Sequence, residues 1–144
     1  FFQEFLYRSK SFNLLLFLFK KFTKYFLIMS QNTHIMHLAE EPFNWIKQRK
    51  KCVEVRLYDE KRQKINLGDI IIFRKINSNE EIRARVKGLF RFQTFKDLFS
   101  FMPKQYLAHD NLSLEDQVAR MRKYYTEEEE EKYGILAIWF EIVE

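Results

Sequence analysis

Residues 49–62 read RKKCVEVRLYDEKR and hold the densest charge of the globular part of the chain. Aliphatic and polar residues alternate in this stretch, which predicts a β-strand over 52–58. Side chains two positions apart lie on the same face of a strand, so Glu54 and Arg56 are expected to be neighbours. Lys51 lies just before the strand, where its amine can reach that face. The stretch therefore predicts a cluster of ammonium, carboxylate and guanidinium groups.

The rest of the chain alternates between strand and helix signals. Further strands are predicted from their apolar patterns at 35–38, 70–73, 81–92 and 135–143. Helices are predicted from capping residues and helical periodicity at 42–50, 95–102, 114–125 and 127–133. Gly88 indicates a β-bulge. This order of elements predicts an α+β fold: a small, curled, mostly antiparallel sheet or barrel with helices packed against its ends.

Three helix starts carry recognisable capping residues, one of which is Ser113 before the helix at 114–125. Thr94 with Asp97 predicts an N-cap, and Thr126 with Glu129 predicts a capping box. The glutamates at 127–131 then occupy the first turns of the last helix, where carboxylates suit the helix dipole. We interpret this glutamate run as a solvated helix N-terminus.

Composition places the chain among soluble globular proteins. It has 144 residues, with 47% hydrophobic and 31% charged, which suits a single domain with a proper core. The single cysteine excludes an internal disulfide framework and favours a reducing compartment, so we predict a cytoplasmic protein. His34, His37 and His109 lack metal-ligand spacing, and no glycine-rich phosphate loop is present. We therefore predict neither a metal nor a cofactor.

Residues 1–28 differ in kind from the rest. They hold eight of the sixteen phenylalanines and +4 of the net charge of +5. The remaining part is therefore nearly neutral, and the overall basicity does not by itself argue for nucleic-acid binding. Since the first methionine is Met29, we interpret 1–28 as a basic, aromatic extension foreign to the native protein and 29–144 as the domain. A basic helix lying on a membrane surface is the alternative.

Residues 49–56 resemble the signature Gly-x-Lys-x-x-Glu-x-Arg of the ASCH domain, a branch of the PUA-like superfamily of small β-barrels. Further segments that resemble parts of the ASCH domain follow in the order expected for that family, at 57–62, 67–73, 95–99 and 133–141. The resemblance covers about 35–143. One departure is plain: Arg49 occupies the position of the signature glycine, so a residue less suited to it must make any left-handed turn there.

The resemblance implies a PUA-like barrel with a cleft lined by Lys51, Glu54 and Arg56, and RNA or a modified nucleoside as the ligand. Some relatives are amidohydrolases of N4-acetylcytidine that use a lysine, a threonine three residues later and a carboxylic acid from a later loop. Lys51 matches that lysine, Glu54 fills the threonine position, and Asp110 matches the acid by a loose alignment. Because the hydroxyl nucleophile is missing, that mechanism does not carry over, and enzymatic activity stays open.

Two functions are left open by these residues. The first is binding of RNA or a modified nucleoside, with ligand-binding residues Lys51, Glu54, Arg56, Tyr58 and Arg62. The second is a hydrolase of modified nucleosides or of RNA, with Lys51, Glu54 and the loop acid as catalytic groups. The structural alternative is an ion-pair network at the mouth of the barrel. Nothing in the sequence predicts an oligomeric state.

Several tyrosines are candidates for stacking on a base. They are Tyr58, Tyr106, Tyr124, Tyr125 and Tyr133. Base stacking on aromatic side chains is sequence-tolerant and common in RNA-binding domains. Packing in the core or at the barrel rim, with the hydroxyl reaching water, explains a tyrosine equally well.

Overall fold

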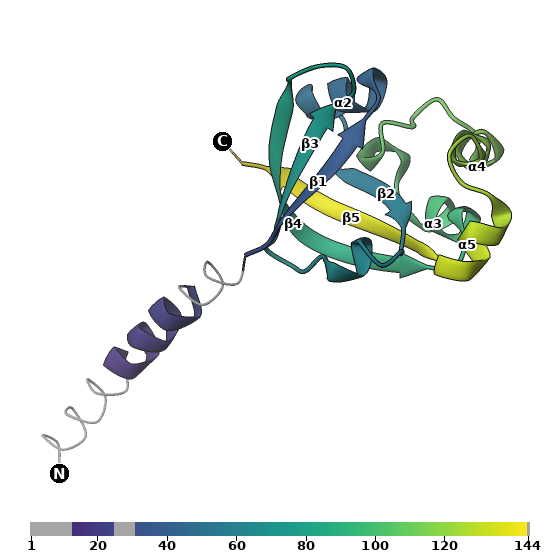
Figure 1. The fold of residues 1–144 in the computed structure, drawn as a ribbon. Coiled ribbons are helices and arrows are strands. Elements are labelled where there is room, and N and C mark those ends of the chain that lie inside the picture. The colour runs from purple at the N-terminus through teal and green to yellow at the C-terminus, as the bar shows by residue number, and fades with distance from the viewer. Residues whose placement is uncertain (1–12, 25–30, 144) are drawn as a thin grey trace, which may run out of the picture. The chain divides into compact units, whose positions relative to one another are not determined.

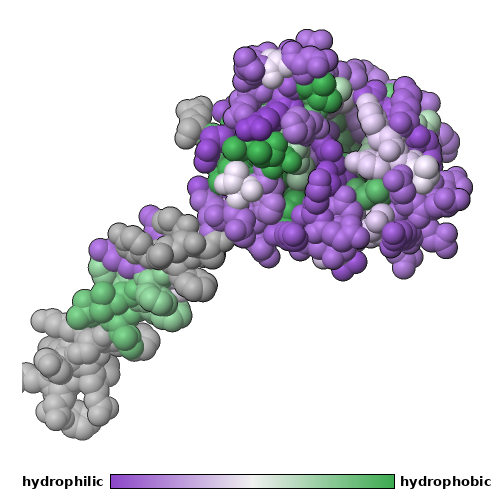
Figure 2. All heavy atoms as spheres, viewed as in Figure 1, coloured by the Kyte–Doolittle hydropathy of each residue, from purple (hydrophilic) through white to green (hydrophobic). Residues whose placement is uncertain are grey.

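The computed structural model describes residues 13–24 and 31–143, and the chain divides into two compact units, 1–31 and 32–144. In the first unit, residues 13–24 form a helix with a largely hydrophobic surface (Figure 2). The other residues of the predicted extension lie outside the described ranges, and its origin stays a prediction. Neither described range contains a helix with the length and apolar character needed to span a bilayer.

A five-stranded sheet forms the body of the second unit (Figure 1). The strands are β1 (Thr33–Leu38), β2 (Val53–Leu57), β3 (Ile70–Lys75), β4 (Glu81–Phe92) and β5 (Ile135–Ile142). Their order is β1-β3-β4-β5-β2; β1 and β3 are parallel, whereas β3–β4, β4–β5 and β5–β2 are antiparallel. The register shifts between Val86 and Gly88, which confirms the predicted bulge.

The sheet curls until its two edge strands, β1 and β2, approach each other. Arg56 Nη2 in β2 donates a hydrogen bond of 3.0 Å to the backbone carbonyl of His37 in β1. Within the described residues, the backbones of β1 and β2 do not pair, so the barrel is half-closed along this gap, which we call the seam. The predicted α+β fold with a small, mostly antiparallel, curled sheet is confirmed.

Two apolar clusters pack on opposite faces of the sheet. The helices around them are α2 (Glu40–Lys47), α3 (Phe95–Phe101), α4 (Leu114–Arg122) and α5 (Glu127–Tyr133), with short 3₁₀ turns η1 (Arg62–Lys64) and η2 (Lys104–Tyr106). Leu136, Ile138 and Phe140 of β5 belong to the cluster under α2. Ile135 and Ala137 belong to the cluster under α3 and α4. Because side chains alternate along a strand, β5 is buried on both faces, which explains its nearly continuous apolar sequence.

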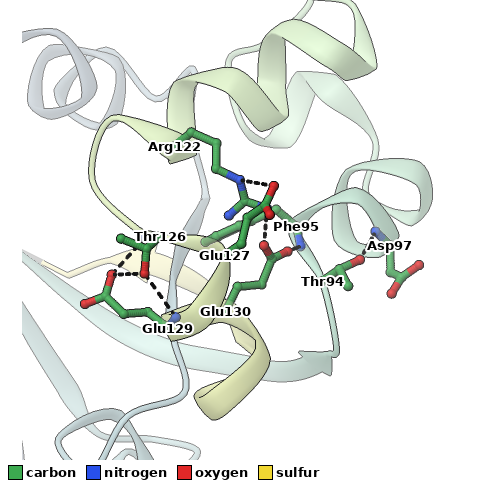
Figure 3. A network of polar contacts seen from close by, with 8 residues as sticks. All are labelled: Thr94, Phe95, Asp97, Arg122, Thr126, Glu127, Glu129 and Glu130. Carbon is green, nitrogen blue, oxygen red and sulfur yellow. Dashed lines mark hydrogen bonds and ion pairs between the residues drawn. The ribbon is translucent and has the colours of Figure 1, made fainter.

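Not all of the glutamates in α5 are solvated, contrary to our interpretation of the sequence. Glu130 is 5% exposed, and its carboxylate accepts a hydrogen bond of 2.6 Å from the backbone N–H of Phe95 (Figure 3). It also pairs with Arg122 at the end of α4. The first N–H groups of a helix have no intrahelical partner, so Glu130 caps α3 while linking it to α4 and α5. The predicted caps are confirmed: Thr94 with Asp97, and Thr126 with Glu129.

Arg49 follows α2 and has a φ of 60°, in the left-handed region. That conformation costs a non-glycine residue about 1–2 kcal/mol. Glycine avoids this cost but loses more conformational entropy on folding, so its net advantage is smaller. We predict that Arg49→Gly is more stable than Arg49→Val by about 1 kcal/mol in urea unfolding. Both variants lose the arginine side chain, so their difference reports on the backbone alone. At Lys50, where φ is not positive, we expect Lys50→Val to be more stable than Lys50→Gly. Equal stabilities at position 49 would contradict the backbone argument.

Candidate functional site

A cavity of about 290 Å³ opens beside the cluster that the sequence predicts. Its lining comes from α2, β2, the loop after η2 and α4, and includes Trp45, Lys51, Glu54, Arg56, Phe99, Leu107, His109, Arg120, Tyr124 and Tyr125. The volume lies at the lower end of the range for small-molecule sites, about 300–1,000 Å³, and suits a base or a nucleoside. A larger hollow of about 1030 Å³ near α5 is lined by one stacking candidate, Tyr133, but by none of the predicted catalytic or ligand-binding residues, so the smaller cavity is the candidate site.

Three predicted residues meet in the wall of this cavity. Lys51 Nζ lies 2.9 Å from Glu54 Oε2, and their side chains are 9% and 6% exposed. Arg56 Nε donates a hydrogen bond of 2.8 Å to Glu54 Oε1. The ammonium meets Oε2 as an ion pair, off the best direction for a hydrogen bond, and this oxygen is almost fully buried. A carboxylate has about four lone-pair sites, so Glu54 can accept a further hydrogen bond beside these two cations.

The electrostatics of the cluster keep the carboxylate charged. Burial alone would raise the pKa of Glu54, but the charges of Lys51 and then Arg56 outweigh it and lower the pKa below its ordinary value of 4.5. Burial would likewise lower the pKa of Arg56, yet Glu54 and Tyr125 raise it. At neutral pH the cluster thus holds two cations and one anion. The cavity wall carries an excess positive charge.

The local fold explains how these side chains come together. Along β2, Val53, Val55 and Leu57 point into one apolar cluster, so Glu54 and Arg56 point to the opposite face. Just before β2, an isolated antiparallel bridge joins Lys51 to Leu107, and the N–H of Cys52 donates a hydrogen bond of 2.9 Å to the carbonyl of Tyr106. These contacts hold the loop after η2 against the start of β2.

This loop also brings His109 into the cavity, which the sequence did not predict. His109 is 7% exposed, and its Nδ1 lies 3.0 Å from Nε2 of the fully buried Gln117 in α4. Its ring packs edge-on against Trp45. Burial, then the charges of Lys51 and Arg120, lower the pKa of His109 to about 4, so the ring is neutral at pH 7.

Three other predicted residues lie outside this cavity. The ring of Tyr58 lies 3.9 Å from the guanidinium carbon of Arg91, and Arg62 Nη1 donates a hydrogen bond of 2.9 Å to Asp59 Oδ2. Asp110 is exposed, and its sequence neighbour faces the cavity instead. Any role of these three in binding or catalysis stays a prediction.

Aromatic side chains complete the cavity, and metal-binding groups are not clustered there. Tyr124 and Tyr125 are the predicted tyrosines that line it, whereas Tyr106 does not. Arg120 lies over the Trp45 ring at 5.3 Å. Within residues 13–24 and 31–143, no three histidine, cysteine or acidic side chains are grouped to hold a metal ion. The site therefore offers hydrogen bonds, charge and ring faces.

Comparison with known proteins assigns the chain to a family. The family model of the ASCH domain matches residues 36–144, which include every residue that lines the cavity. The chain belongs to the ASCH domain family. The resemblance found in the sequence is thereby confirmed, and the α+β half-barrel is the fold of this ASCH domain.

Solved structures include similar chains. The crystal structure of hypothetical protein PH0355 is 38% identical, covers 77% of this chain and 99% of that chain, and has a TM-score of 0.70. Protein PF0455 from Pyrococcus furiosus, solved by NMR, is 36% identical, covers 78% and 98%, and has a TM-score of 0.63. An ASCH protein from Zymomonas mobilis is only 14% identical, with a TM-score of 0.43 over 76% and 67% of the two chains. No curated protein matches this ASCH domain.

Removing the central carboxylate should be costly, because it leaves two buried cations without a counter-charge. We predict that Glu54→Gln lowers the free energy of unfolding by about 3–5 kcal/mol. Replacing Lys51, Glu54 and Arg56 together by methionine should recover most of that loss, because no buried charge is then left unpaired. Chemical denaturation of both variants measures the difference. A nearly neutral Glu54→Gln would show that the ion pairs are not formed.

The low pKa of His109 makes stability depend on pH. The unfolded chain takes up a proton below about pH 6.5, whereas the folded histidine does so only near pH 4. Stability should therefore fall as the pH drops from 6.5 to 4, by on the order of 2 kcal/mol. We predict that His109→Gln, which cannot titrate, has a smaller slope in this window. Urea unfolding at pH 7.0, 5.5 and 4.5 tests this, and an unchanged slope would show that His109 is not buried as described.

Proposed function

We propose that this ASCH domain binds a single base of RNA or a modified nucleoside in the cavity, through Lys51, Glu54 and Arg56. The observation that carries the proposal is the Glu54 carboxylate in the wall of the cavity, with Lys51 on one oxygen and Arg56 on the other. The polar edge of a base presents donors beside acceptors. A carboxylate accepts from an exocyclic amine, while an ammonium and a guanidinium donate to a ring nitrogen or carbonyl.

The walls of the cavity suit the faces of a base. Trp45 and Tyr124 both line it, and Tyr124 is 69% exposed at its mouth. Stacking of a base on an aromatic side chain contributes about 1–3 kcal/mol and requires no particular base. Because a base in a duplex has neighbours on both faces and a paired edge, the cavity suits an unstacked base of single-stranded RNA or a free nucleoside.

The alternative is a hydrolase that acts on modified nucleosides or RNA. The Lys51–Glu54 ion pair beside His109 favours it, since these are groups that move protons in enzymes. However, a general base works best with a pKa near the operating pH, and the pKa of Glu54 is lowered away from it. A carboxylate that stays ionised is a strong hydrogen-bond acceptor. The electrostatics thus support binding better than catalysis.

Tryptophan fluorescence offers a direct test. The chain has two tryptophans: Trp45 in the cavity and Trp139, a half-exposed residue of β5 outside it. In a Trp139→Phe variant the signal comes from Trp45 alone, so titration with nucleosides and short single-stranded RNAs reports on the cavity. We expect saturable quenching by at least one of them. No change with any of the four nucleosides, N4-acetylcytidine or RNA at low salt would contradict the proposal.

Stacking at the mouth of the cavity can be tested separately. We predict that Tyr124→Ala weakens the binding of a nucleoside by about 1–3 kcal/mol, roughly five- to 150-fold in Kd. The matched control is Tyr106→Ala, which removes a half-exposed tyrosine outside the cavity and should leave Kd unchanged. Equal effects of the two substitutions would argue against a base at the mouth.

Assays for released product with N4-acetylcytidine and RNA test the hydrolase, and turnover lost in Lys51→Ala would favour it.

A further inference from the structure

We infer that the ligand is a phosphorylated nucleotide unit, as in an RNA strand, and that its phosphate binds in a second hollow along the seam between β1 and β2. This inference rests on the proposed function, because it places the phosphate next to a base held in the cavity. It adds a binding site, formed mainly by Lys61 and Lys64, and it distinguishes a nucleotide from a free nucleoside.

The two hollows adjoin. The second has a volume of about 420 Å³ and is lined by residues 33–37 of β1, by Arg56, and by Lys61, Arg62, Lys64 and Ile65 in and around η1. His37 and Arg56 line both the cavity and this hollow. The hydrogen bond between them, from the Arg56 guanidinium to the His37 carbonyl, crosses the seam between β1 and β2. The Arg56 guanidinium thus forms part of the wall of both sites, the cavity for the base and the hollow for the phosphate.

The charge of the second hollow is strongly positive. Four of its lining side chains are cationic, and none is a carboxylate: the cations are Arg56, Lys61, Arg62 and Lys64. Two of them are held by carboxylates outside the hollow, Arg56 by Glu54 and Arg62 by Asp59. No acidic side chain in the described part of the chain lies within ion-pair distance of Lys61 or Lys64. Two lysine charges therefore lack a counter-ion.

The backbone arranges these two lysines for a shared ligand. Lys61 has helical φ and ψ and directly precedes the 3₁₀ turn η1, which ends at Lys64. In a 3₁₀ helix, with three residues per turn, side chains three positions apart lie one above the other on the same face. Lys61 and Lys64 thus project from one side of η1, and both are exposed. Paired, exposed ammonium groups facing a hollow are suited to bind a phosphate.

The positive charge is local and is not a by-product of a basic protein. Residues 29–144 carry a net charge of only +1, yet four cations line this one hollow. The adjoining cluster shares Arg56 with this hollow, and only two carboxylates, Glu54 and Asp59, are paired with the five cations Lys51, Arg56, Lys61, Arg62 and Lys64. A neutral nucleoside would leave these charges unmatched. A phosphate attached to the same nucleoside would neutralise them, with Arg62 close enough to contribute.

The test compares nucleosides with their monophosphates. Cytidine, adenosine, uridine and guanosine are each titrated against their 3′- and 5′-monophosphates at low salt, using the Trp45 signal and NMR of the lysine region. At least one monophosphate should bind about tenfold more tightly than its nucleoside. The double variant Lys61→Ala/Lys64→Ala should remove this gain and leave the affinity for the nucleoside unchanged. Lys96→Ala/Lys132→Ala, which removes two exposed lysines outside both hollows, is the charge-matched control and should keep the gain.

The outcomes separate this inference from the function on which it rests. If nucleosides bind in the cavity but a phosphate adds no affinity, the phosphate site is wrong and the base site stands. The phosphate site is equally wrong if the gain survives in the Lys61/Lys64 variant, or is lost to the same extent in the control. If no nucleoside and no monophosphate binds, the proposed function fails and the phosphate site fails with it.

Discussion

The Glu54 carboxylate, held between Lys51 and Arg56, is the interaction on which the rest of the structure depends. It allows two cations to be buried at the start of β2 and within it. Arg56, oriented by that carboxylate, also reaches across the seam to the carbonyl of His37 and ties the two edge strands together. Lys51 is held in turn by the bridge to Leu107, which docks the loop after η2. One carboxylate thus links sheet closure to the shape of the cavity.

Stability alone does not explain this arrangement. Replacing a buried ion cluster by apolar side chains of similar volume is often neutral or stabilising, because the desolvation cost disappears. Here two buried cations also share a single carboxylate, so the cluster keeps an excess positive charge. The cluster lies in the wall of a cavity lined by aromatic rings. A site with a buried carboxylate and excess positive charge is organised for a ligand that supplies a donor and a negative charge.

The sequence predicted what depends on local periodicity, and missed what depends on distant contacts. Alternation along β2 placed Glu54 and Arg56 on one face, and the small, curled, mostly antiparallel sheet followed from the order of strands and helices. His109 carried no such signal, because it enters the cavity only through the pairing of Lys51 with a distant loop. Glu130 looked like a solvated residue in a glutamate run, since its partner, the N–H at the start of α3, lies 35 positions away. Long-range pairing leaves no period in the sequence.

A crystal structure of the full chain soaked with cytidine 5′-monophosphate would test the central claim most directly. We expect the base inside the cavity, with its exocyclic amine within about 2.7–3.2 Å of a Glu54 carboxylate oxygen and its phosphate beside Lys61 and Lys64. Density for the base outside the cavity, or a Glu54 carboxylate turned away from Lys51 and Arg56, would contradict the account.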